Sequence, residues 1–208
     1  MARVGAVILA AGQSSRFRAA GGQDLTKLVA KLDGKPIVRR VVEAALTTKA
    51  RPVILVTGYA RDSVEAAVAH LDISVAFNPE FASGLASSLR IGLTAMPPDV
   101  AGALVLLGDM PWIEPRLADA LIDAFLARQG ALAAVLSREG RRGNPVLLSQ
   151  GLFEAAMRLA GDEGARRLIG ALSASELVEV ETPDTGVTFD IDTPEDLAAA
   201  RRLVGGDR

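Results

Sequence analysis

Two acidic motifs far apart in the sequence carry the oxygen ligands that divalent cations prefer. Asp109 lies in the segment LGDMP, directly after an apolar run, and Asp190 and Asp192 lie in the later segment DIDTP. Carboxylates and substrate phosphates are the usual ligands of Mg²⁺ at sites of phosphoryl chemistry. If the later segment forms a strand, both of its acids point to the same side. We predict that Asp109 and one of these acids share a cation, while the other acid could cap or approach the following helix.

A loop of small and hydroxyl residues follows the first apolar run of the chain. The segment LAAGQSSRF begins at Leu9 and carries Arg16 near its end, and Lys27 lies eleven positions beyond that arginine. Small side chains let backbone N–H groups approach phosphate oxygens, and the two cations would neutralise a triphosphate. The loop is therefore a candidate phosphate-binding site. An ordinary strand-to-loop turn has a similar composition, and this pattern alone does not separate the two interpretations.

A second loop of this kind follows a later apolar run. Residues 78–88 read NPEFASGLASS and open a helical pattern. One hypothesis is that the segment contacts the base or ribose of a nucleotide. The other is that its Asn and Ser side chains only cap the helix.

Several motifs of other enzyme classes are absent from the sequence. There is no GxxxxGK[ST] run, which excludes a P-loop. A dinucleotide site needs GxGxxG after the first strand and an acid at the end of the second, but here only Gly12 is present and the second run ends in Val56-Thr57-Gly58. A nicotinamide oxidoreductase is thus disfavoured. His70, the single histidine, is expected to be exposed at the end of a helix, so we assign it no catalytic role and expect no Ser-His-acid set; one histidine also cannot form a histidine metal cluster.

The candidate residues follow short apolar runs that alternate with helix-period patterns. Runs that are apolar on both faces indicate strands covered by helices on both sides, hence a mostly parallel sheet. The alternation predicts an α/β fold with a single-domain, doubly wound, mostly parallel sheet over residues 1–204, and a disordered tail at 205–208. Ligands of such sheets bind beyond the carboxyl ends of the strands. The predicted strands are Val4–Leu9, Val53–Val56, Ile73–Phe77, Leu104–Leu107, Leu132–Leu136 and Val146–Leu148, and the predicted helices are Ile37–Leu46, Ser63–His70, Leu85–Met96, Pro115–Ala127 and Leu152–Leu159, with another helix starting at Pro194.

Composition and charge limit the class of partner. The formal net charge is −2, so the molecule as a whole does not attract nucleic acid or an anionic membrane. Residues 1–51 nevertheless hold ten Lys or Arg against three Asp or Glu, as a small polyanionic ligand would require. The apolar runs are far too short to span a membrane. The absence of cysteine excludes disulfides and thiolate metal sites and fits a cytoplasmic location.

Taken together, the motifs resemble those of the MobA-like nucleotidyltransferases, especially the molybdenum cofactor cytidylyltransferases. The resemblance runs nearly end to end, through LAAGQSSRF (9–17), KLVAKLDGKPI (27–37), VTGY (56–59), NPEFASGLASSL (78–89), GDMP (108–111), RGNPVLLS (142–149), GDEGARRLI (161–169) and DIDTPEDL (190–197). It implies a Rossmann-like nucleotidyltransferase fold of the nucleotide-diphospho-sugar transferase type.

The resemblance also implies roles for particular residues. Arg16, Lys27 and Asp109 would be catalytic, and Asp109 and Asp190 would hold Mg²⁺. The run Ala10-Ala11-Gly12 resembles that of members which use CTP. The acceptor would be molybdopterin or another phosphate-bearing molecule, and an acceptor molybdoenzyme would be a further partner. The residues implied to bind the nucleotide are Leu9, Ala10, Ala11, Gly12, Ser14, Ser15, Arg16, Lys27, Gly84, Ser87 and Asp109.

Two alternatives stay open at this stage. The first is a cytidylyltransferase for a sugar or polyol phosphate such as methylerythritol phosphate, since it would share the first motif. The second is a carrier or chaperone without catalysis, which hands a cofactor to another protein. The paired acids and Lys27 argue against the second, because a pure binder has no need of paired metal ligands.

Overall fold

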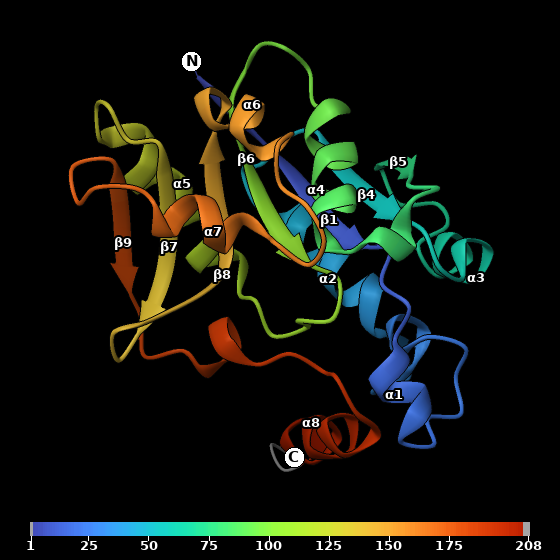
Figure 1. The fold of residues 1–208 in the computed structure, drawn as a ribbon. Helices are drawn as coiled ribbons and strands as arrows, with labels where there is room; N and C mark the ends of the chain where they lie inside the picture. Colours follow the sequence, from blue (N-terminus) through green and yellow to red (C-terminus); the bar gives the residue numbers. More distant parts are fainter. Residues whose placement is uncertain (1, 206–208) are drawn as a thin grey trace.

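The computed structural model describes residues 2–205 of the 208-residue chain and shows one seven-stranded sheet with helices on both faces (Figure 1). The strands of this sheet are β1 (Arg3–Ala10), β4 (Val53–Thr57), β5 (Ser74–Phe77), β6 (Val100–Leu107), β7 (Ala133–Arg138), β8 (Arg141–Ser149) and β9 (Leu177–Glu181), and β2 (Lys31–Leu32) and β3 (Lys35–Pro36) form a separate pair. The order is β5-β4-β1-β6-β8-β7-β9. Within the seven-stranded sheet, only the pairs that β8 makes with β6 and β7 are antiparallel. The predicted single-domain, mostly parallel α/β fold is confirmed.

Two apolar clusters, one on each face of the sheet, explain why the strands are apolar on both sides. In β1, Ile8 packs into one cluster with α2, α3 and α5, whereas Val7 and Leu9 pack into the other with α4, α6 and α7. The helices are α1 (Ser15–Ala19), α2 (Ile37–Thr47), α3 (Arg61–Ala67), α4 (Leu85–Thr94), α5 (Pro115–Ala127), α6 (Phe153–Ala156), α7 (Ala165–Gly170) and α8 (Pro194–Gly205), with short 3₁₀ turns at Lys27–Val29, Phe81–Ser83, Gln150–Leu152 and Thr185–Thr188.

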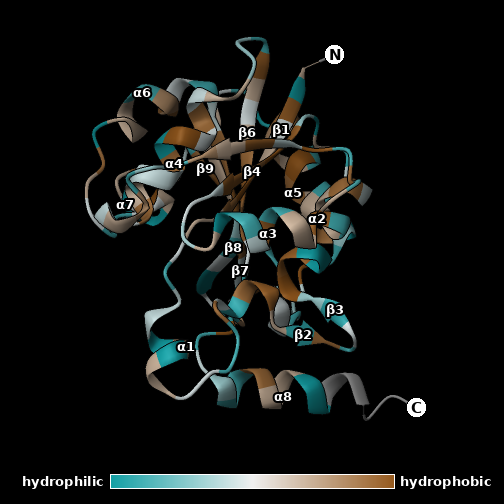
Figure 2. Cartoon of the chain, turned by 90° about the vertical axis from the view of Figure 1, so that its right-hand side faces the viewer, coloured by the Kyte–Doolittle hydropathy of each residue, from teal (hydrophilic) through white to brown (hydrophobic). Residues whose placement is uncertain are grey.

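A third apolar cluster lies beyond the carboxyl ends of the central strands. It joins Phe17 of α1, Leu32 of β2 and Leu197 of α8, with Ile191 between them, and all four side chains are buried. Figures 1 and 2 both show α8 returning beside α1, away from the sheet. Helices α1 and α8 are thereby packed together next to the loop that follows β1.

Two expectations about secondary structure are corrected near the far edge of the sheet. The predicted strand Val146–Leu148 is longer in the structure: β8 begins at Arg141 and pairs with β7 in a hairpin, where Arg142 is held by an ion pair to Glu179. Glu179 belongs to β9, a strand that was not predicted. Its exposed acids hide the apolar pattern, because only one face of this edge strand is covered.

Helix ends also differ from the predicted limits. The expected helix Leu152–Leu159 is a 3₁₀ turn followed by the short α6, and α3 ends before His70, which is exposed and has a positive φ of 70°. Gly205 ends α8, and residues 206–208 of the predicted tail lie outside the described residues. In the part of the chain that the structure describes, no helix is long and apolar enough to cross a membrane.

Candidate active site

A cavity of about 480 Å³ lies at the carboxyl ends of β1 and β6. From β1 the chain proceeds to β4 and β5 on one side, whereas β6 lies on the other side, so this is a point where the strand order reverses. Ligands of open parallel sheets bind at such a point. The cavity is lined by Leu9, Ala10, Ala11, Gly12, Gln13, Ser14, Ser15, Arg16, Lys27, Leu28, Phe81, Ala82, Gly84, Leu85, Ser88, Leu107, Asp109, Asp162 and Asp192.

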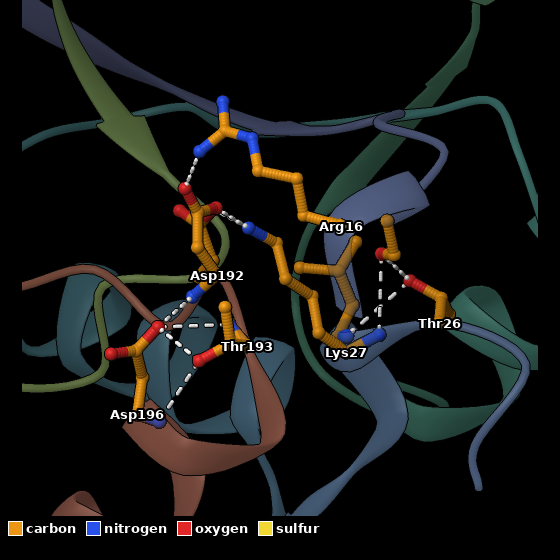
Figure 3. Close-up of polar contacts among 9 residues, drawn as sticks. Arg16, Thr26, Lys27, Asp192, Thr193 and Asp196 are labelled. Atoms are coloured by element: carbon orange, nitrogen blue, oxygen red, sulfur yellow. Dashed lines mark hydrogen bonds and ion pairs between the residues drawn. The ribbon is translucent and has the colours of Figure 1, made fainter. Parts of the chain in front are cut away.

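Lys27 joins the two acidic motifs at this cavity. Its ammonium Nζ lies 2.6 Å from a carboxylate oxygen of Asp109 and 2.6 Å from one of Asp192, and Arg16 also pairs with Asp192 (Figure 3). The Lys27 side chain is only 12% exposed. Residues separated by more than 80 positions in the sequence thus form one ion network, which links the loop after β1, the end of β6 and the segment before α8.

The loop that carries Lys27 is held by hydroxyl groups. The Ser14 and Thr26 hydroxyl oxygens lie 2.8 Å apart, and the backbone N–H of Lys27 donates to Ser14 Oγ at 3.2 Å. Ser14 itself has a left-handed backbone with φ 52°, a conformation that is costly for a residue with a side chain and is often found at functional sites. These bonds orient Lys27 toward the cavity before any ligand arrives.

The ionisation state of Lys27 follows from its surroundings. Burial lowers its pKa, but the charges of Asp109 and Asp192 and their hydrogen bonds raise it, and the pKa lies above its ordinary value of 10.5. Lys27 is therefore a fixed positive charge at neutral pH rather than a proton acceptor. The stability that the raised pKa of Lys27 contributes is present below the ordinary value of 10.5 and is lost as pH rises through the raised value.

The DIDTP segment is not a strand, which corrects the expected alternation of its acids. It is an extended loop whose Ile191 N–H donates to the backbone oxygen of Asp109 at 3.1 Å, while the Ile191 side chain is buried in the third apolar cluster. The two acidic motifs are therefore adjacent, as their pairing at one site requires.

Neither of the two acids in that segment caps the following helix. Thr193 does so: its hydroxyl accepts from Asp196 N–H at 3.2 Å, and Asp196 Oδ2 accepts from Thr193 N–H at 2.8 Å and from Asp192 N–H at 3.1 Å. This reciprocal pair is a capping box. It fixes the backbone of Asp192 and leaves its carboxylate for Lys27 and Arg16 (Figure 3).

Asp192, rather than Asp190, reaches the position opposite Asp109. Asp192 lines the cavity, and the Lys27 ammonium between Asp109 and Asp192 shows that these two carboxylates already converge on one cation. Asp190 lies close enough to Asp192 and Asp109 for their charges, after burial as the larger cause, to raise the pKa of its carboxyl. It does not line the cavity. Within residues 2–205, no three His, Cys, Asp or Glu side chains are grouped to hold an ion alone. Two carboxylates fit a divalent cation that takes its other ligands from phosphates and water.

All residues predicted to bind the nucleotide line the cavity except Ser87, and their contact with a nucleotide stays a prediction. Ser87 is buried, and its hydroxyl donates to the backbone oxygen of Gly84 at 2.8 Å and accepts from the Asn78 side chain at 2.8 Å. It therefore braces the loop before α4, but the capping hypothesis is wrong, because Gly84 is the N-cap of α4 and no side-chain hydrogen bond caps the helix there. The next residue, Ser88, lines the cavity instead.

Sequence reasoning also missed Asp162 as a lining residue. It lies in the GDEGARRLI motif, far from the other site residues in the sequence, and no local pattern marks it. Only the packing of its neighbour Gly161 against Gly84 brings it to the cavity.

Replacing Gly84 by Ala is expected to disturb this packing. Gly84 has φ +103°, and an added Cβ would lie 2.3 Å from the backbone of Gly161. We expect Gly84→Ala to lower the free energy of unfolding by about 2 kcal/mol, since both the backbone strain and the clash are costly. Denaturant unfolding measures this, with Gly130→Ala as a control that has a similar positive φ of 81° but open space around it. Equal losses in the two variants would show that the Gly161 contact is unimportant.

Comparison with known proteins identifies the family of this chain. The family model of the MobA-like NTP transferase domain matches residues 6–177. The bifunctional protein GlmU of Paraburkholderia xenovorans (strain LB400) is 31% identical over 199 residues, which are 96% of this chain but only 36% of that protein. This chain thus spans much less than the full length of the GlmU proteins it matches. The molybdenum cofactor cytidylyltransferase of Escherichia coli (strain K12) is 28% identical over 207 residues, 97% of both chains.

Solved structures share the whole fold. The crystal structure of Rv0371c from Mycobacterium tuberculosis H37Rv has a TM-score of 0.80 and 26% identity, and the match covers 96% of this chain and 98% of that one. A further structure of Rv0371c is a complex with manganese.

Proposed function

We propose, from the premise that this chain belongs to the MobA-like NTP transferase family and is a nucleotidyltransferase, that it transfers CMP from CTP to the molybdenum cofactor and releases pyrophosphate. The observation that carries this proposal is the position of Lys27 between Asp109 and Asp192, at the cavity bounded by the small-residue loop after β1. The full-length similarity to the Escherichia coli molybdenum cofactor cytidylyltransferase supports the choice of CTP and of this acceptor.

The proposed reaction needs positioning and charge neutralisation more than covalent help from the protein. A phosphate oxygen of the acceptor forms a new bond to the α-phosphorus of the triphosphate. The bond from that phosphorus to the oxygen bridging to the β-phosphorus breaks, and pyrophosphate leaves with the electron pair. Arg16, Lys27 and the backbone N–H groups of the loop at residues 11–15, which line the cavity, would neutralise the charge that builds up on this leaving group.

We propose Mg²⁺ as the divalent cation, held by Asp109 and Asp192. A bound divalent cation would neutralise phosphate charge and orient the triphosphate. The manganese complex of Rv0371c supports divalent-metal binding by a relative with the same fold. Lys27 would then exchange its present carboxylate partners for phosphate oxygens.

Replacing each of the two acids of the DIDTP segment in a separate variant tests whether Asp192 holds the cation. We expect Asp192→Asn to lower kcat by about 10²-fold and to raise the Mg²⁺ concentration needed for half-maximal activity, because it removes a charged ligand. Asp190→Asn, the matched control in the same segment, should stay within about ten-fold of the wild type. Steady-state pyrophosphate release over a Mg²⁺ titration measures both. A larger loss in Asp190→Asn would return the metal role to Asp190.

A pyrophosphate-release screen tests the proposed function as a whole. The four ribonucleoside triphosphates are each supplied with Mg²⁺, with molybdenum cofactor, with methylerythritol phosphate, or with no acceptor. Release that requires both CTP and molybdenum cofactor is expected. Release with the polyol phosphate would favour the alternative cytidylyltransferase, and nucleotide binding without release under any condition would favour a non-catalytic carrier.

A further inference from the structure

The residues that line the cavity form two groups with different chemistry. Arg16, Lys27, Asp109 and Asp192 form the ion network described above. The second group contains three apolar side chains and two polar ones, and it lies at the start of α4. Its members are Phe81, Ala82, Leu85, Ser88 and Asp162, around Gly84.

The loop after β1 connects these two groups. Ala11, near its start, lies beside Phe81: a Cβ added to Gly58 would be 2.6 Å from the Cβ of Phe81 and 2.7 Å from that of Ala11. Arg16, at its end, pairs with Asp192. A nucleotide lying along this loop with its phosphates at Arg16 and Lys27 therefore places its base against the apolar group.

Asp162 is held in this second group by backbone contacts with α4. Gly161 O accepts from Ala86 N–H at 3.0 Å, and Leu159 O accepts from the Arg90 side chain at 2.6 Å. Gly84 has no side chain, so the Gly161 backbone can approach it closely. The segment before α7 is thus tied to α4, which sets the backbone position of Asp162, while its side chain is exposed.

The carboxylate of Asp162 is free to accept a hydrogen bond from a ligand. Among residues 2–205 it makes no hydrogen bond or ion pair, whereas its neighbour Glu163 pairs with Arg167 and accepts from Ala160 N–H. An ionised carboxylate only accepts hydrogen bonds. It therefore favours a ligand edge that carries N–H donors and disfavours one that carries a carbonyl oxygen.

We infer that Asp162 determines base specificity by accepting a hydrogen bond from the exocyclic amino group of the base. Cytosine offers an N4 amino donor at that edge, where uracil has an acceptor oxygen that the carboxylate would repel. The inference rests on the proposed function, because it assumes that a nucleotide occupies the cavity in the stated direction. It goes further by assigning the preference for CTP over UTP to one side chain.

Isothermal titration of the full chain with CTP, UTP and dCTP in the presence of Mg²⁺ tests this inference. The wild type should bind CTP about ten-fold more tightly than UTP, the size expected for one hydrogen bond to a charged group. Asp162→Asn should bind the two about equally, because a carboxamide can either accept or donate at the same place. Glu163→Gln is the matched control: it removes the same charge one residue away, does not line the cavity, and should keep the wild-type preference.

Each other outcome contradicts a specific step. If Asp162→Asn keeps the preference for CTP, or if the wild type has none, Asp162 does not read the base. Suppose instead that the wild type prefers CTP over dCTP, and that Asp162→Asn loses this preference but still prefers CTP over UTP. The carboxylate then contacts the ribose, and the inference is wrong. If the wild type binds none of the three nucleotides, the proposed function itself fails. Circular dichroism of the variant checks its fold, which should be unchanged because no internal bond is removed.

Discussion

Replacing Asp109 by Asn is expected to lower the rate of pyrophosphate release by about 10³-fold while the protein stays folded. The carboxylate is one of the two that converge on Lys27, and it lies at the carboxyl end of β6 beside the loop that follows β1. The substitution keeps the shape of the side chain but removes the charge that would hold a divalent cation against the triphosphate. The backbone bond from Ile191 to Asp109 O does not depend on this charge, so the fold should persist. Steady-state release at saturating CTP and Mg²⁺ measures the effect.

A matched control distinguishes this loss from a general charge effect. Asp123→Asn makes the same change at an exposed carboxylate of α5 that pairs with Lys49. Its activity should equal that of the wild type. If Asp109→Asn retains a rate within ten-fold of the wild type, Asp109 does not have the role assigned to it.

Replacing Lys27 by Met is expected to lower kcat/KM by about 10²- to 10³-fold, because it removes a fixed positive charge that faces the leaving group. The variant should also be less stable without metal, by about 1–3 kcal/mol, since two partly buried carboxylates lose their shared cation. A divalent cation that binds between Asp109 and Asp192 would replace the missing ammonium. Mg²⁺ should therefore raise the Tm of Lys27→Met more than that of the wild type.

The thermal part of this prediction is independent of catalysis. Scanning calorimetry of wild type and variant, each with and without Mg²⁺, gives four Tm values whose double difference should be positive. Lys35→Met is the matched control, because Lys35 pairs with Glu43 at the surface away from the cavity. An equal Mg²⁺ effect on all three proteins would show that no cation binds between the two carboxylates.

The amino-acid sequence by itself determined the class of fold and the first half of the site. Strands such as β1 are recognisable because a strand buried on both faces carries no charged or polar side chain, and the seven consecutive residues from Val4 to Ala10 meet that requirement. The loop after β1 and Lys27 are close in the chain, so their residue types could be recognised from neighbouring positions alone. Asp109, which follows β6, was predicted to lie near this loop, because the carboxyl ends of neighbouring parallel strands share one edge of the sheet. In the structure Asp109 lines the same cavity as the loop.

Only the tertiary structure decided which of several similar residues reach the cavity. Asp192 rather than Asp190 meets Lys27, 165 positions away in the chain, because burial of Ile191 and the capping box at Thr193 set the local backbone. Ser88 rather than Ser87 lines the cavity, because Ser87 bonds inside its own loop. Asp162 reaches the cavity because its neighbour Gly161 contacts the start of α4, where the Gly161 and Gly84 backbones approach closely. A one-residue choice of this kind depends on which side chain a distant segment covers, and no pattern of neighbouring residues contains that information.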